Sequence, residues 1–332
     1  MSIVNENHEK CIESDKTDKH NNTEFKDPVN FNLGKNIEKQ IEDNLNNIIN
    51  FDSLNDKKNF DNSTIERFEG ELSNKKTRNK KNTIEIFKTV VPLNSVEKFI
   101  EFLNYKLSEK KLLFIRHVEA EHNAFNKHQK ILGLPKPKFF DPSITEFGGK
   151  QSEEIAINLK NLDFEVNVVF TSPLRRTLQT LEKLKNLYDF RAKNFIVTEL
   201  LREEVINQQT HTGHTLSKLK DAFNHIDYLN YDYILKEIWW CIEHEEDCHH
   251  TCFSKETKLE LNFRIALFLI WFILREERNA IVISHSKIYK AICGYPPSEK
   301  PIKNSQSFVI DHKIIMSNIV NMVNDVLYKG EI

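Results

Sequence analysis

The sequence predicts an α/β fold, a three-layer α/β/α sandwich with a mostly parallel central sheet, preceded by a disordered N-terminal arm. Short apolar runs alternate with longer segments of helical periodicity over residues 112–293, and this alternation is typical of strands joined by helical crossovers. Polar and charged residues follow each apolar run. Because open α/β sheets hold their ligands outside the carboxyl ends of the strands, we expect a functional site at that edge.

The N-terminal arm is predicted to span residues 1–83. Asn, Lys, Asp and Glu dominate it, and its apolar residues are too scattered to build a core. A short helix fits the spacing of residues 37–51. The basic run at residues 75–81 is compatible with a nuclear address, although a solvated linker is the favoured interpretation. Residues 84–332 are enough for one domain with its own core.

Four apolar runs bounded by polar residues are the expected strands: Leu112–Arg116, Val166–Thr171, Phe195–Thr198 and Ala280–Ser284. Four segments with apolar residues at helical spacing are the expected helices: Glu146–Leu162, Pro173–Tyr188, Leu259–Arg275 and Lys287–Cys293. Pro173 suits the first turn of its helix, where a backbone N–H has no partner inside the helix.

The most hydrophobic stretch, Ile265–Leu274, is bounded by Arg264 and Arg275. It is too short for a membrane span, which needs about 20 apolar residues. Since it is apolar on all sides, we expect a helix buried against the sheet or at a contact between copies of the chain, which leaves a homo-oligomer open. A formal net charge of −2 gives no electrostatic footprint for nucleic acid or an anionic membrane.

The chain has five cysteines and no apolar leader after Met1. We therefore expect a reducing, cytoplasmic environment rather than a disulfide framework. Cysteines and histidines gather at His244–Cys252 and suggest a metal site. Structural zinc usually takes four ligands from two spaced pairs, and no second pair is present, so a polar surface insertion without metal is favoured.

Charged or polar side chains follow every expected strand, as cationic groups, an amide, a hydroxyl or carboxylates. They are Arg116, His117 and Asn123 after the first, Ser172, Arg175 and Arg176 after the second, Glu203 and Glu204 after the third, and His285 after the fourth. Guanidinium forks bind phosphate bidentately, and histidine can bind a phosphoryl group or attack it. The set therefore indicates an anionic ligand with several oxygens.

In this order, the residues resemble the histidine phosphatase superfamily, which includes the cofactor-dependent phosphoglycerate mutases. The matching segments are Arg116-His117-Val118 with Asn123, Asp141–Gly148 with Gln151, Ser172 with Arg176, Leu201-Arg202-Glu203, and Ser284-His285. The His122-Asn123 pair and the region of Trp239, Trp240 and Arg264 are more similar to a phosphoglycerate mutase-like subgroup of plants and fungi. Each fragment alone is a weak signal, whereas five in order over residues 112–310 are a strong one.

The resemblance implies roles for these residues, and we expect no cofactor. His117 resembles the nucleophile that becomes phosphohistidine, and Glu203 resembles the general acid and base, with Glu204 as the alternative acid. His285 completes the catalytic set and binds the phosphoryl oxygens together with Arg116, Arg176 and the further donor Asn123. The chemistry agrees, because phosphoryl transfer needs mainly positioning and positive charge around the oxygens.

The chain departs from the family pattern at two places. Val118 stands where the family has a glycine, and its Cβ restricts the backbone beside the nucleophile. His211–Thr215 replaces a Cys-Asp-Arg-Arg-like run of the subgroup, so substrate selection is expected to differ.

Three functions follow from the resemblance. The first is a phosphatase that hydrolyses a small phosphomonoester through phospho-His117. The second is a phosphoglycerate mutase-type transfer, and the third is a non-catalytic protein that binds phosphate-containing ligands. The segment at residues 124–137 lacks the Gly-Trp stretch of the glycolytic mutases, which favours the phosphatase.

Overall fold

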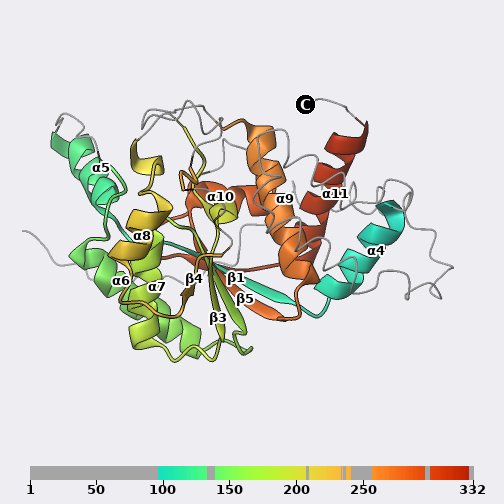
Figure 1. Ribbon diagram of the computed structural model, residues 1–332, viewed down its shortest axis with the longest axis horizontal. Helices are drawn as coiled ribbons and strands as arrows, with labels where there is room; N and C mark the ends of the chain where they lie inside the picture. The colour runs from blue at the N-terminus through green and yellow to red at the C-terminus, as the bar shows by residue number, and fades with distance from the viewer. Residues whose placement is uncertain are drawn as a thin grey trace, which may run out of the picture. The chain divides into compact units, whose positions relative to one another are not determined.

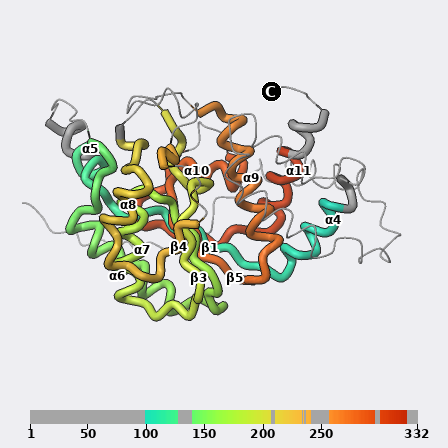
Figure 2. The backbone as a smooth tube through the Cα atoms, in the orientation of Figure 1, coloured from blue at the N-terminus to red at the C-terminus, as the bar shows by residue number. Residues whose placement is uncertain are grey.

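The computed structural model describes residues 96–132, 139–206, 209–232, 234, 237–240, 256–295 and 300–328, which are coloured in Figure 1, and Figure 2 traces the same backbone as a tube. Four predictions lie outside these residues: the arm at 1–83, the helix at 37–51, the basic run at 75–81 and the His244–Cys252 insertion. The domain boundary at residue 84 therefore stays a prediction.

One sheet forms the centre of the described residues, with strand order β4-β3-β2-β5-β1-β6. Its strands are β1 (Lys111–Arg116), β2 (Val168–Thr171), β3 (Asn194–Val197), β4 (Leu229–Asn230), β5 (Asn279–Ser284) and β6 (Ser307–Ile310). β6 runs antiparallel to β1, and all other neighbours are parallel. The predicted α/β fold with a mostly parallel sheet is confirmed.

The helices are α4 (Val96–Leu107), α5 (Glu121–Leu132), α6 (Glu146–Lys160), α7 (Arg175–Leu187), α8 (Leu216–Ala222), α9 (Lys258–Leu274), α10 (Ser286–Ile292) and α11 (His312–Tyr328), with short 3₁₀ turns η2 (Glu199–Leu201) and η3 (Gln209–His211). One predicted start is wrong: α7 begins at Arg175, and Pro173 lies before its N-cap, Leu174. The backbone N–H of Leu174 donates to Ser172 Oγ, and this hydrogen bond holds Pro173 in the turn before the helix.

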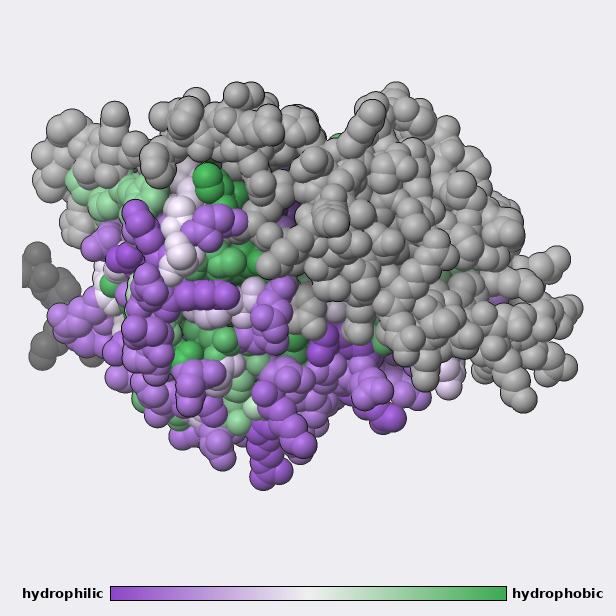
Figure 3. Space-filling view, in the orientation of Figure 1, coloured by the Kyte–Doolittle hydropathy of each residue, from purple (hydrophilic) through white to green (hydrophobic). Residues whose placement is uncertain are grey.

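Helices cover both faces of the sheet (Figure 1). Alternate residues of β1 supply the two cores. Ile115 belongs to the core that α6 and α7 cover with Ile155 and Leu181. Phe114 points to the other face, where its ring lies 5.3 Å from Tyr289 of α10. The outer surface over α6, α7 and α8 is mainly hydrophilic in the view of Figure 3, so these helices are amphipathic.

α9 contains the apolar stretch and is buried along nearly its whole length. A capping box at Thr257 and Glu260 begins the helix. Inside the fold, Phe268 and Trp271 contact Phe170 of β2, with ring centroids 5.2 and 5.3 Å apart. The stretch is therefore a helix packed on the sheet. Of the helices that the structure describes, none is long and apolar enough to cross a membrane.

Candidate active site

Three neighbouring strands bring the two predicted histidines together. β2, β5 and β1 are adjacent and parallel, so their carboxyl ends meet at one edge. His117 follows β1 and His285 follows β5, and both side chains are buried. Their ring centroids lie 5.2 Å apart in an edge-on arrangement. The backbone N–H of His117 also donates to the backbone oxygen of Ser284 at 2.9 Å. This bond joins the segments that follow β1 and β5 just beyond the last paired residues of the two strands.

Arg176 joins the two histidines. It lies in the first turn of α7 and is 1% exposed. Its Nε donates to His117 Nε2 at 3.3 Å, and its Nη2 lies 3.3 Å from His285 Nδ1. Its Nη1 donates to the backbone oxygen of Thr210 at 3.0 Å. The guanidinium group is therefore held in one orientation between both imidazoles.

The start of α7 is held by Asp141. The Arg175 N–H donates to Asp141 Oδ1 at 2.9 Å, so a carboxylate caps the helix that carries Arg176. Asp141 is 1% exposed, and burial raises the pKa of its carboxyl group to about 6. Its φ of 38° is a left-handed conformation that Asp and Asn tolerate better than other side chains.

Hydrogen bonds define the tautomers of both histidines. His117 Nδ1 lies 2.7 Å from the Val118 oxygen. A carbonyl oxygen only accepts, so Nδ1 carries the proton and Nε2 has the lone pair. His285 Nε2 lies 2.9 Å from Ser172 Oγ. With Arg176 donating to His285 Nδ1, the proton of His285 is on Nε2. A nucleophilic nitrogen of His117 therefore faces the guanidinium group.

The charges of the cluster favour a dianionic ligand. Burial, followed by the charge of Arg176, holds the pKa of His117 well below 6.5. The same two causes lower the pKa of His285. Burial lowers the pKa of Arg116 to about 10, which still leaves it charged at neutral pH. The imidazoles are thus neutral at pH 7, while the arginines supply positive charge that a phosphoryl group would neutralise.

The two candidate acids point in different directions. Glu203 Oε2 lies 4.0 Å from His285 Nδ1, so this carboxylate borders the histidine cluster. Glu204 Oε2 instead pairs with Lys287 of α10 at 3.5 Å. The Glu204 N–H donates to Glu203 Oε1 at 3.0 Å and restrains the side chain of its neighbour. This arrangement favours Glu203 as the acid.

Arg116 and Asn123 contribute to the loops around the cluster. Arg116 Nη1 donates to the Ile302 oxygen, and its charge interacts with Glu203 and Arg176. Asn123 Oδ1 accepts from the Ala120 N–H at 3.1 Å and from Asn304 Nδ2 at 3.2 Å. The amide oxygen of Asn123 therefore holds the loop after β1, and its predicted contact with substrate stays a prediction.

Asn304 is a site residue that the sequence analysis missed. Its Nδ2 donates to the His117 oxygen at 3.1 Å as well as to Asn123. It thereby connects the segment before β6 to the backbone of the predicted nucleophile. An isolated asparagine in an Asn-rich chain gives no sequence signal for such a contact.

A buried ion-pair network holds the turn that carries Glu203. Arg264 of α9 donates from Nη1 to the Leu200 oxygen at 2.6 Å and to the Arg202 oxygen at 3.0 Å. Its Nε and Nη2 reach the two carboxylate oxygens of Glu256 at 2.8 and 2.7 Å. Arg202 Nη2 also pairs with Glu256 at 3.0 Å. The sequence pointed to the Arg264 region but not to this function or to Glu256.

Val118 does not face the histidine cluster. Its side chain is fully buried in the core under α6, together with Ile115 and Ile155. A Cβ at Gly148 would lie 3.1 Å from Val118 Cγ2 and 2.3 Å from the Glu119 oxygen. α6 therefore approaches this loop closely, and the glycine that allows the approach is Gly148 on the helix. The valine fills the core beside His117.

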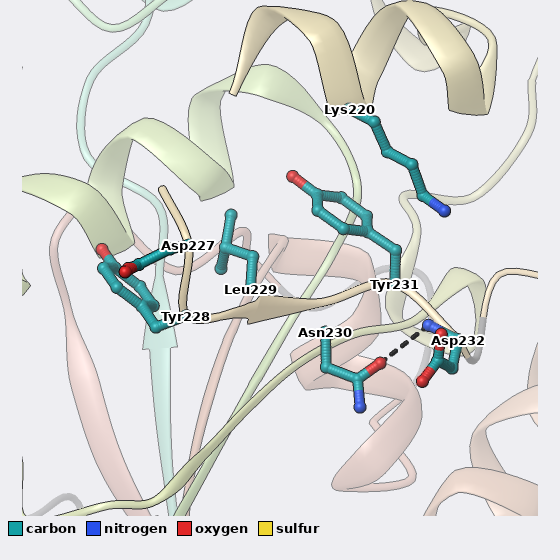
Figure 4. Close-up of a pocket in the computed structure, with 7 residues that line it drawn as sticks. All are labelled: Lys220, Asp227, Tyr228, Leu229, Asn230, Tyr231 and Asp232. Atoms are coloured by element: carbon teal, nitrogen blue, oxygen red, sulfur yellow. Dashed lines mark hydrogen bonds between the residues drawn. The ribbon is translucent and has the colours of Figure 1, made fainter. Parts of the chain in front are cut away.

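A separate pocket of about 340 Å³ lies at the β4 edge of the sheet (Figure 4). Lys220 of α8 and Tyr231 border it, and none of the predicted site residues lines it. Within the described residues no group of His, Cys, Asp and Glu is arranged to hold a metal ion.

Comparisons with known proteins agree with the resemblance. The family model of the histidine phosphatase superfamily (branch 1) matches residues 112–313. Phosphoglycerate mutase-like protein 1 of Arabidopsis thaliana is 24% identical over 195 residues, which are 53% of this chain and 68% of the relative. Phosphoserine phosphatase 1 of Hydrogenobacter thermophilus is 31% identical over 101 residues, 30% of this chain and 39% of the relative.

Solved structures give similar matches. The alpha-ribazole phosphatase from Shigella flexneri is 19% identical, with a TM-score of 0.38, and the match covers 60% of this chain and 90% of that one. A mycobacterial glucosyl-3-phosphoglycerate phosphatase is 17% identical, with a TM-score of 0.38 and coverage of 60% and 89%. Because the family model spans more than half of its length, the chain belongs to the histidine phosphatase superfamily.

Proposed function

We propose that the protein hydrolyses a small phosphomonoester through a phosphohistidine at His117. The observation that carries the proposal is the bridge of Arg176 between His117 and His285, with Glu203 Oε2 4.0 Å from His285. Fixed positive charge, a histidine nitrogen that keeps its lone pair and a neighbouring carboxylate are the parts that phosphoryl transfer requires. The family of the chain and the name of the phosphoserine phosphatase relative support the same activity.

The first step transfers the phosphoryl group to the protein. The phosphoryl group takes the place of the Arg176 contact at His117 Nε2, whose lone pair forms the N–P bond as the ester P–O bond breaks. Glu203 in its acid form gives its proton to the leaving oxygen. Arg116, Arg176 and His285 bind the remaining oxygens of the phosphoryl group.

The second step returns the protein to its starting state. The Glu203 carboxylate accepts a proton from water while the water oxygen attacks phosphorus. The P–N bond breaks, the electron pair returns to His117 Nε2, and inorganic phosphate leaves. In a mutase, a second hydroxyl of the substrate would take the place of this water.

The identity of the acid is tested by leaving-group dependence. Glu203→Gln should slow hydrolysis of an alkyl phosphate far more than that of p-nitrophenyl phosphate, whose leaving group scarcely needs a proton. Glu204→Gln is the matched control and should affect both esters alike. Equal losses in Glu203→Gln, with the selective loss in Glu204→Gln, would exchange the two assignments.

The reaction class is tested with a panel of phosphate esters. We expect release of inorganic phosphate at a rate that does not depend on 2,3-bisphosphoglycerate. An isomerised ester that accumulates only with that compound would identify a mutase. Binding of the esters without phosphate release or isomerisation would identify a non-catalytic protein.

A further inference from the structure

The backbone around His211 is fixed against the site. Arg176 Nη1 donates to the oxygen of Thr210, the preceding residue, at 3.0 Å. On the other side, Trp239 Nε1 donates to the His214 oxygen at 2.9 Å. Arg176 and Trp239 are both at most 2% exposed. Two buried side chains thus restrain the segment that differs from the family pattern.

The ring of His211 presents a hydrogen-bond acceptor. His211 Nδ1 lies 2.5 Å from the Glu204 oxygen, which can only accept, so Nδ1 carries the proton and Nε2 has the lone pair. Burial lowers the pKa of His211 below 6.5, so the ring is neutral at pH 7, although Glu203 opposes the shift. In the part of the chain that the structure describes, no hydrogen bond occupies Nε2.

The ring of His211 lies beside the predicted acid. Its Nδ1 bonds to the backbone oxygen of Glu204, the residue after Glu203, and the oxygen of the preceding residue, Thr210, accepts from Arg176. The alcohol leaves on the side of Glu203, so His211 borders the leaving group. A neutral acceptor at this position accepts a hydrogen bond from a hydroxyl group and has no proton to give to a carboxylate.

We propose that His211 Nε2 accepts a hydrogen bond from a hydroxyl group of the leaving alcohol, so that the substrate is the phosphate ester of an uncharged polyol. This assignment rests on the phosphatase activity proposed above. It excludes leaving groups that bear a carboxylate next to the ester, because the carboxylate would face the lone pair of His211, and both groups can only accept a hydrogen bond.

Three small esters of similar size test the proposal: 2-hydroxyethyl phosphate, n-propyl phosphate and 2-phosphoglycolate. For the wild type we expect kcat/KM for the hydroxyl ester to exceed that for the propyl ester by about tenfold, the size that one hydrogen bond supports. The carboxylate ester should be the poorest of the three.

Two variants of His211 separate its nitrogens. His211→Asn keeps a donor for the Glu204 oxygen but lacks the outer acceptor, so the ratio between the hydroxyl and propyl esters should fall to about one. His211→Gln places an oxygen where Nε2 was and should keep part of the preference. His225→Asn, on an exposed histidine that pairs with Glu182, is the matched control and should keep the wild-type ratio. Circular dichroism confirms that each variant is folded.

The outcomes separate this proposal from the phosphatase activity. An active wild type without a preference for the hydroxyl ester, or a preference that persists in His211→Asn, overturns the assignment to His211. If no ester is hydrolysed, the phosphatase proposal fails, and binding of the three esters is measured by calorimetry instead. Equal affinities would then overturn the polyol subsite as well, whereas tighter binding of the hydroxyl ester supports it.

Discussion

Replacement of Arg264 by methionine should destabilise the protein and misplace Glu203. The change removes four hydrogen bonds, two to Glu256 and two to the backbone of the turn before Glu203. Burial alone would raise the pKa of Glu256, but Arg264 and Arg202 lower it from 4.5 to about 2. At about 1.36 kcal/mol per pKa unit, this lowering corresponds to roughly 3.4 kcal/mol in favour of the charged Glu256 carboxylate. Breaking a buried ion pair costs about 3–5 kcal/mol, so we expect Arg264→Met to lose stability of that size.

Urea unfolding at pH 7 measures the loss of stability in Arg264→Met. Arg278→Met is the matched control, because the Arg278–Glu109 pair is exposed and 3.5 Å long, and it should cost less than about 0.5 kcal/mol. The lowered pKa means that Glu256 stabilises the wild type above pH 4.5 and that this contribution is lost as the pH falls toward 2. The acid loss should be smaller in Arg264→Met.

The activity of Arg264→Met distinguishes a positioning role from general destabilisation. Hydrolysis of alkyl phosphates should fall more than that of p-nitrophenyl phosphate, since Glu203 would be misplaced. If the methionine variant does not fold, Arg264→Lys, which keeps the charge but not the fork, should show an intermediate loss. A stability loss below about 1 kcal/mol, or equal losses with both esters, would refute this reasoning.

Three further changes give independent tests. Val118→Gly should lower the free energy of unfolding by about 2–4 kcal/mol, from the lost buried side chain and the added chain entropy, as measured by chemical denaturation. The rate of hydrolysis per folded molecule should stay almost unchanged. Faster hydrolysis than in the wild type would show that the valine restricts the phosphate loop. Burial raises the pKa of Asp141 to about 6, so the stability contributed by its protonated form is present below about pH 4 and lost as the pH rises through 6. Asp141→Asn, which does not titrate, should therefore gain up to about 3 kcal/mol relative to the wild type between pH 4 and 7. In thermal unfolding, a difference between the two proteins that does not vary with pH would contradict this. Removal of residues 1–82 should change the melting temperature and hydrolysis little, because that segment has few clustered apolar residues, and a large drop in either would show that the segment contributes to the domain.

The central strands could be predicted because they are buried on both faces. β1 and β5 are continuous apolar runs, and their observed limits differ by one residue from those predicted. β6 was missed because it is an edge strand, and its Val309 is 56% exposed. β4 consists of Leu229–Asn230 alone, too short for any periodic signal. Edge strands depend on contacts with their neighbours more than on their own sequence.

The candidate site could be predicted where function is carried by residues at strand ends. His117 and His285 follow strands that the sequence identified, and the structure brings them together. Asn304 and Glu256 could not be found in this way. Asn304 contacts His117 across 187 positions of sequence, and Glu256 acts only through the fold of α9 against the Glu203 turn. Such contacts depend on the packed structure and leave no local pattern.

The nucleophile is tested most directly by trapping the covalent intermediate. The protein is mixed with a phosphate ester labelled with radioactive phosphorus, quenched in alkali, digested and mapped by mass spectrometry. We predict an acid-labile phosphoryl group on His117 that disappears in a folded His117→Ala variant, together with turnover. A label on another residue, or normal turnover in His117→Ala, would contradict a reaction through phospho-His117.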